Sequence, residues 1–383
     1  MAKFLRNDEE IRILRTEKQL EDYLTFRKED DRWYTPYINE ITAIGVENTP
    51  LSLVDGLKEH GIEESESVME TVEDYGLFID FPRKDGSGYL PLRGTAFLGL
   101  CKVSGTNCRA VTNYTPKAKD RLLPLKTKAE WITTGCSLRE IPCKILFRDE
   151  KVSAVATRRY EILPQWELVD ALTDAIGKEF TDFSFHKAEI SHDYSSFSYR
   201  IHDEEMEDSI KGFLADCNIM SKEIKVGVSL ATSDIGLSRA YAYLYFEYDG
   251  VFVQLGNIAE MIHDFGNTVS KFRGSIKNIG EAFQENEDRI EELGNTEITD
   301  VPNCVKNILE TYPIFPSKIA EPVLEEFAIK NGSKAGTAAD CYLSFFSMAE
   351  KARQGGTANP RSYIETMQRI AKMLTLRYTA FDK

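Results

Sequence analysis

The sequence lacks the signatures of the best-known nucleotide-binding and hydrolytic sites. It has no G-x-x-x-x-G-K-S/T phosphate loop, no G-x-G-x-x-G fingerprint, no H-E-x-x-H pair and no G-x-S-x-G motif. It also has no internal repeat of fixed period and no low-complexity stretch. No catalytic residue is indicated by motif, and a non-enzymatic role is favoured.

Long apolar runs are also missing. No stretch of 18 apolar residues is present, so no membrane span is expected, and the first ten residues lack the apolar core of a signal peptide. We therefore expect a cytoplasmic protein that makes no membrane contact.

Cysteine is present, but not in the usual pairing motifs. The seven cysteines include no C-x-x-C pair, and an odd count favours reduced thiols over a disulfide scaffold. Two pairs, Cys101 with Cys108 and Cys136 with Cys143, repeat a seven-residue spacing, and a four-thiolate site is one interpretation of that repeat. Zinc sites normally use tighter loops, so buried small hydrophobes are the favoured interpretation. No metal or cofactor is expected.

The length and the pattern of elements predict an α+β protein. A chain of 383 residues exceeds the usual size of one domain. The expected units are a mixed α/β N-terminal region, a strand-rich central domain built on an antiparallel sheet, and a helical C-terminal domain. They span residues 1–128, 129–256 and 257–383.

Local signals predict several elements. A short apolar helix capped by Thr95 should end near Gly105, and a hairpin should turn at residues 148–150. Asp249-Gly250 is a type I′ hairpin signal within the sheet. From Ile258 to Phe283, apolar residues recur every three or four positions and predict one long helix that Gly266 and Gly274 can interrupt.

Several short segments resemble a known family. Residues 152–163, followed by 167–172, look like the central signature of the domain-of-unknown-function family 932, whose members are often labelled phage/plasmid-like proteins. Residues 228–236 and 336–342 are similar to further parts of that pattern. The resemblance implies a mobile-element setting, and it supplies no catalytic residues.

Charge is segregated along the chain. The net charge of −15 should repel nucleic acid on average. From Glu59 to Asp80 there are eight acids and no Lys or Arg, whereas from Arg109 to Lys128 six basic residues face one acid. The basic segment predicts a phosphate-contacting loop, joined by two arginines of the hairpin region; the alternative is a solvated surface loop. The residues expected to bind nucleic acid are Arg109, Lys117, Lys119, Arg121, Lys126, Lys128, Arg158 and Arg159.

A small-residue loop between two strands is a second candidate site. Its N–H groups and hydroxyls can contact an anion, although its ordinary role would be a turn in which Asp234 bonds the local backbone and Gly236 takes a positive φ. The candidate ligand-binding residues are Thr232, Ser233, Asp234, Gly236, Ser238 and Arg239.

Three functional hypotheses follow. The leading one is a non-enzymatic accessory protein of a phage, plasmid or integrated element that binds nucleic acid in DNA replication or recombination. The alternative is an acidic protein-binding factor, such as an inhibitor of host defence or an assembly factor, in which Glu63, Glu64 and Glu66 engage a basic host or phage protein. The least favoured is a metal-dependent hydrolase or nuclease using the pairs His192-Asp193 and His202-Asp203, because adjacent strand residues point to opposite faces. The C-terminal helices are compatible with an oligomer contact.

Overall fold

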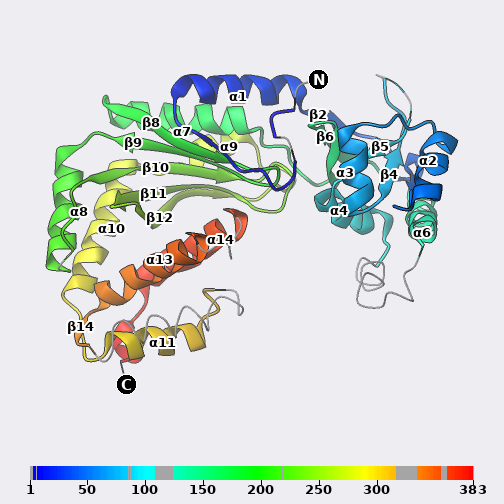
Figure 1. Ribbon diagram of the computed structural model, residues 1–383. Helices are drawn as coiled ribbons and strands as arrows, with labels where there is room; N and C mark the ends of the chain where they lie inside the picture. Colours follow the sequence, from blue (N-terminus) through cyan, green and yellow to red (C-terminus); the bar gives the residue numbers. More distant parts are fainter. Residues whose placement is uncertain are drawn as a thin grey trace.

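The computed structural model describes residues 3–5, 7–84, 86, 88–107, 124–217, 219–315, 334–354 and 360–382. The chain forms two lobes of unequal size that lie side by side (Figure 1). Both combine helices with antiparallel sheet, so the predicted α+β class is confirmed.

The large lobe is built on one six-stranded sheet in which every pairing is antiparallel. The expected turn at Asp249-Gly250 is present, with φ values of 44° and 83°. In spatial order the strands are β1 (Arg12–Leu14), β8 (Phe183–Ile190), β9 (Ser195–Ile201), β10 (Ile224–Thr232), β11 (Ala240–Tyr248) and β12 (Val251–Met261).

Helices cover both faces and one end of this sheet (Figure 1). On one face lie α1 (Glu17–Asp30), α7 (Gln165–Glu179) and α9 (Val269–Ser275). On the other lie α13 (Ala338–Gln354) and α14 (Pro360–Ala371), which both pack on β12. The remaining elements of this lobe are α8 (Glu204–Asp216), α10 (Ile279–Gly294), β13 (Glu297–Ile298), α11 (Val301–Thr311), β14 (Gly336–Thr337), η2 (Lys372–Thr375) and η3 (Tyr378–Ala380).

The small lobe has two three-stranded sheets and its own apolar core. Cys101, Cys136 and Cys143 are buried in that core as free thiols, whereas Cys108 lies outside the described residues. The elements are β2 (Arg32–Tyr34), η1 (Ile38–Glu40), β3 (Thr42–Gly45), α2 (Pro50–Glu59), α3 (Glu66–Asp74), β4 (Leu77–Asp80), β5 (Leu90–Pro91), α4 (Gly94–Ser104), α6 (Leu125–Ser137), β6 (Cys143–Arg148) and β7 (Lys151–Thr157).

Helix α4 forms one wall of the junction between the lobes, and it ends where the sequence predicts. Gly105 caps it with a φ of 73°. Thr95 does not cap its start, because the Thr95 hydroxyl donates to the carbonyl oxygen of Ser153 on β7. The helix lies tightly on β7: a Cβ added at Gly99 would stand 1.8 Å from the Val155 oxygen.

The lobes are not divided at the boundaries expected after Lys128 and Gly256, which fall inside α6 and β12. The chain crosses between the lobes at Asp31 and again over residues 158–164. The reason is non-local pairing, since β1 joins the large sheet through β8 and β2 joins β6.

The prediction of one long helix from Ile258 to Phe283 is wrong. Pairing with β11 keeps β12 extended to Met261, and Gly266, at a φ of 82°, then turns the chain. Two separate helices follow, α9 and α10, capped by the side chains of Thr268 and Asn278. The three-to-four spacing of apolar residues therefore spans three elements that share one core.

None of the helices within the described part of the chain combines the length and the apolar character that crossing a bilayer requires.

Candidate functional site

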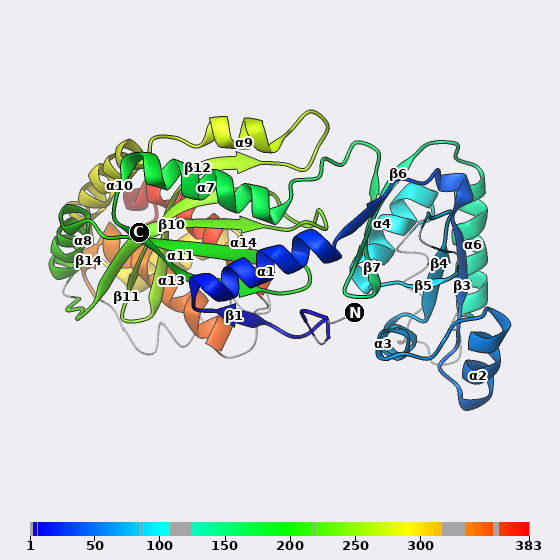
Figure 2. The same ribbon diagram turned by 90° about the horizontal axis from the view of Figure 1, so that it is seen from above.

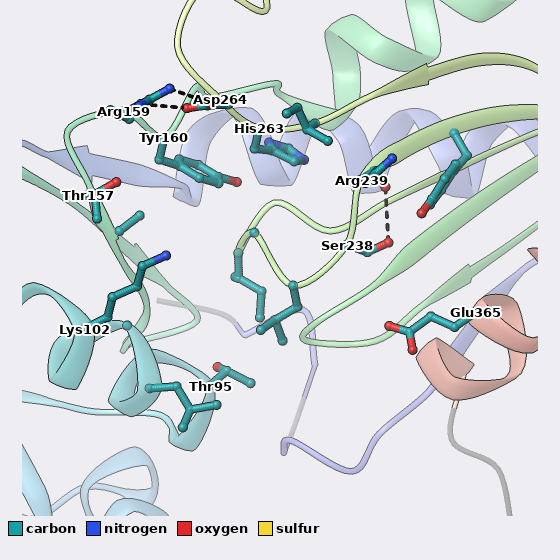
Figure 3. A pocket seen from close by; sticks show the side chains of 18 of the residues that line it. Thr95, Lys102, Thr157, Arg159, Tyr160, Ser238, Arg239, His263, Asp264 and Glu365 are labelled. Carbon is teal, nitrogen blue, oxygen red and sulfur yellow. Dashed lines mark hydrogen bonds and ion pairs between the residues drawn. The ribbon is translucent and has the colours of Figure 1, made fainter. Parts of the chain in front are cut away.

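A cleft of about 1010 Å³ lies where the two lobes meet (Figure 3). The small lobe contributes α4 and the end of β7 to its walls. The large lobe contributes the loop between β10 and β11, the residues that follow β12, and α14. The crossing segment runs between them through Arg159 and Tyr160.

The charged side chains of the cleft are mostly cationic. Among the described residues that line it, five are Lys or Arg and two, Asp264 and Glu365, are carboxylic acids. This local excess of positive charge stands out against a net charge of −15 for the whole chain. The five cations are Lys102, Arg159, Arg239, Arg369 and Lys372.

These cations differ in how strongly the protein engages them. Arg159 holds Asp264 through two bonds of 3.2 and 3.0 Å, and Arg239 pairs with Glu260. Arg369 donates to main-chain oxygens rather than to a carboxylate.

The two lysines are the most available cations of the cleft. Within the described residues neither Lys102 nor Lys372 has an ion-pair partner. Both are exposed, and Lys102 points from α4 into the cleft (Figure 3). They are therefore the cations best placed to meet an anionic ligand.

An aromatic stack borders the cleft and links the lobes. Tyr160 stacks on Trp33 of the small lobe at a centroid distance of 5.6 Å and on His263 of the large lobe at 5.0 Å. His263 Nδ1 lies 3.1 Å from the carbonyl oxygen of Glu161, which places the ring proton on Nδ1. Burial lowers the pKa of His263 to about 4, so the imidazole is neutral at pH 7.

Next to the cleft, a buried ion network also joins the lobes. Arg148, at the end of β6, binds Asp31 at the end of α1 and Asp234 in the β10–β11 loop, with Nη2 2.6 Å from Asp234 Oδ2. Gln165 donates to the same Asp234 oxygen at 2.6 Å. Burial alone would lower the pKa of Arg148, but the carboxylates of Asp31 and Asp234 outweigh it and raise the pKa.

The network extends through the β6–β7 turn. Arg27 Nη2 lies 2.7 Å from Asp149 Oδ1, and Lys151 Nζ lies 2.7 Å from Glu70 Oε2. Asp149 sits in the left-handed region at a φ of 49°, a conformation that its main-chain bond to Asp30 supports. Arg27, Asp149 and Lys151 are almost fully buried, so this network holds the lobes together inside the protein.

The predicted loop site is split between these two regions. Gly236, Ser238 and Arg239 line the cleft, whereas Thr232, Ser233 and Asp234 are buried. The Ser233 hydroxyl donates to the carbonyl oxygen of Asp193, and Asp234 belongs to the ion network. Gly236 takes the expected positive φ, at 73°.

The residues predicted to bind nucleic acid are not brought into one groove. Arg109, Lys117, Lys119 and Arg121 lie outside the described residues. Lys126 and Lys128 begin α6, on the side of the small lobe away from the large lobe (Figure 2). Lys128 is buried, and burial lowers its pKa. Arg159 lines the cleft and Arg158 is exposed beside it.

The acidic segment is divided in the same way. Glu63 and Glu64 are exposed between α2 and α3, and Glu66 is exposed in the first turn of α3, 3.4 Å from Lys3. Glu70, one turn further on, instead reaches inward to Lys151.

The histidine–aspartate pairs serve turns and caps. The His202 ring bonds the Ser184 hydroxyl at 2.8 Å, and Asp203 caps α8. Asp193 accepts from Ser191 within the turn between β8 and β9. Across the described ranges, no three His, Cys, Asp or Glu side chains are grouped to hold a metal ion.

Three cleft residues were not anticipated from the sequence: Lys102, Arg369 and Lys372. Arg369 and Lys372 are three residues apart, in α14 and η2, but Lys102 is distant from both in the chain, and no motif links it to them. For Lys102, the available signal is a single basic residue in the apolar helix expected at 96–105. A solvent-exposed position on that helix explains this residue as well as a binding role does.

Comparison of the chain with known protein families, with curated proteins and with solved structures found no match.

Proposed function

We propose that the cleft between the lobes binds nucleic acid through its phosphate backbone, and that the protein acts without catalysis in DNA replication or recombination of a phage, plasmid or integrated element. The observation that carries the proposal is the ratio of five cations to two carboxylates in the cleft. The mobile-element setting rests on the family-like segments of the sequence.

The overall charge supports a restricted site. Non-specific binding of nucleic acid depends on neutralising phosphates with Lys and Arg, so an acidic surface disfavours binding elsewhere on the molecule. An excess of one sign of charge in a cleft focuses the field toward its interior. A polyanion would therefore be directed to the junction between the lobes.

The cations come from both lobes. Lys102 belongs to the small lobe, and Arg239, Arg369 and Lys372 belong to the large lobe. A bound strand would therefore contact both lobes, which the buried ion network holds together.

The test is fluorescence anisotropy with labelled DNA and RNA at about 50 and 200 mM salt. The double variant Lys102→Glu/Lys372→Glu should bind more weakly, with the slope of log affinity against log salt reduced by about 2, because each lysine removes about one phosphate contact. The matched control is Lys211→Glu/Lys306→Glu, which makes the same charge change at exposed positions on α8 and α11.

An equal loss in both variants, or no binding by the wild-type protein at about 50 mM salt, would overturn the proposal. The latter result would favour a protein partner for the exposed acids of α3 and the segment before it.

A further inference from the structure

Exposed apolar side chains gather at the rim of the basic cleft. Leu98 on α4 and Ile262 after β12 line the cleft and are 51% and 42% exposed. Phe265 follows the lining residue Asp264 directly and is 77% exposed. The three come from both lobes, as the cations do.

Phe265 is held outward by an ordered turn. Its N–H donates to Asp264 Oδ1 at 2.9 Å, and the N–H of Asn267 donates to the Asp264 carbonyl oxygen at 3.0 Å. The Asn267 side chain closes the turn on the Ile262 oxygen at 3.0 Å. Gly266 supplies the positive φ of 82° that this turn needs.

The turn is also fixed to the cleft itself. Asp264 accepts a hydrogen bond from the Phe265 N–H, and its carboxylate also accepts two hydrogen bonds from the Arg159 guanidinium. Because the turn already fixes the Phe265 backbone, little backbone freedom is lost when the ring packs against a ligand. The protein thus presents an exposed aromatic side chain on a hydrogen-bonded turn beside the cations of the cleft.

A duplex and a single strand would use this arrangement differently. A duplex offers phosphates and groove edges while its base faces are stacked inside, whereas a single strand exposes base faces that stack on aromatic and apolar side chains. Only a single strand can occupy the cations and the rim together.

We infer that the ligand of the cleft is single-stranded nucleic acid, with its phosphates on the cations and its bases on Phe265, Ile262 and Leu98. This inference rests on the proposed function and names the strand class that the same site takes. The cleft volume of about 1010 Å³ is at the upper limit for drug-sized ligands, which suits a segment of strand.

The experiment compares three probes of equal length: a labelled oligothymidylate, the same strand in a duplex, and an abasic deoxyribose-phosphate strand. Wild-type protein should bind the oligothymidylate most tightly. Phe265→Ala should weaken that binding about 5- to 150-fold, the effect of losing one stacked base, while the salt slope stays unchanged. Phe265→Tyr should restore the affinity, because it keeps the ring.

Leu138→Ala is the matched control, since Leu138 is 81% exposed at the end of α6. Equal affinity for the oligothymidylate and the abasic strand, or a Phe265→Ala variant that binds the oligothymidylate as the wild type does, would overturn the inference. If either result is found but any of the three probes still binds in a salt-sensitive way, the inference fails and the proposed function stands. Absence of binding to all three would overturn both.

Discussion

The junction between the lobes contains two charged regions of opposite character. In the buried ion network, the side chain of Arg148 is 5% exposed and is bonded to two carboxylates. Eleven residues later in the chain, the side chain of Arg159 is 70% exposed and lines the cleft with one carboxylate partner. Two arginines of one junction therefore differ in role because of burial and ion pairing: one holds the lobes together and the other faces the cleft.

One loop contributes to both regions. Asp234 points into the network and Arg239 into the cleft, and the chain reverses between them at Gly236. A Cβ added at Gly236 would lie 2.7 Å from the Tyr160 ring, so the close approach of loop and ring requires glycine. The loop therefore couples the fixed side of the junction to the open side.

The largest expected effect is on the buried side. Arg148→Ala leaves Asp234 buried without its cation and leaves Asp31 with Arg27 as its cationic partner, which should reduce the free energy of unfolding by about 3–5 kcal/mol. Arg159→Ala, which removes an exposed arginine of the same junction, should leave the urea midpoint almost unchanged. The measurement is urea unfolding followed by circular dichroism. Comparable shifts in the two variants would break the distinction between the two regions.

His263 lies where the two regions meet, and its titration gives a smaller effect. The pKa of His263 is about 4 in the folded protein and about 6.5 when unfolded, so the unfolded chain binds the proton more tightly. The stabilisation is therefore complete above pH 6.5 and is lost as the pH falls toward 4. Between pH 7.5 and pH 5 it should decrease by about 2 kcal/mol.

The control for this effect is His263→Phe, which keeps a ring against Tyr160 and cannot titrate. Urea unfolding of the variant should lose about 2 kcal/mol less than the wild type over the same pH range. An identical pH dependence of the two proteins would show that the buried imidazole does not contribute.

The sequence predicted the elements of the junction better than the junction itself. The end of α4 at Gly105, the β6–β7 hairpin and the turn at Asp249-Gly250 carry local signals, and all are present. The pairing of Arg148 with Asp31 and Asp234 joins residues distant in the chain, and no local pattern encodes it. Nothing adjacent to Lys102 or Lys372 distinguishes them from other surface lysines.

The same distance explains the errors. The apolar spacing from Ile258 to Phe283 is helical in period, but pairing with β11 keeps its first residues extended, and this tertiary contact outweighs the local preference. The sequence groups Lys128 with the basic loop because it shows charge but not burial, whereas α6 buries the Lys128 side chain.

The smallest expected effect separates the two ends of the loop. Arg239→Gln should leave the urea midpoint nearly unchanged, because the Arg239 side chain is 54% exposed and its partner Glu260 is near the surface. It should reduce the slope of log affinity against log salt for single-stranded DNA by about 1, the loss of one phosphate contact. Asp234→Asn should do the reverse, lowering the urea midpoint through the loss of a buried charge partner of Arg148 while the salt slope stays the same. A salt slope that responds to Asp234→Asn and not to Arg239→Gln would mean that the ligand meets the network side of the loop, and the assignment of the two regions would have to be exchanged.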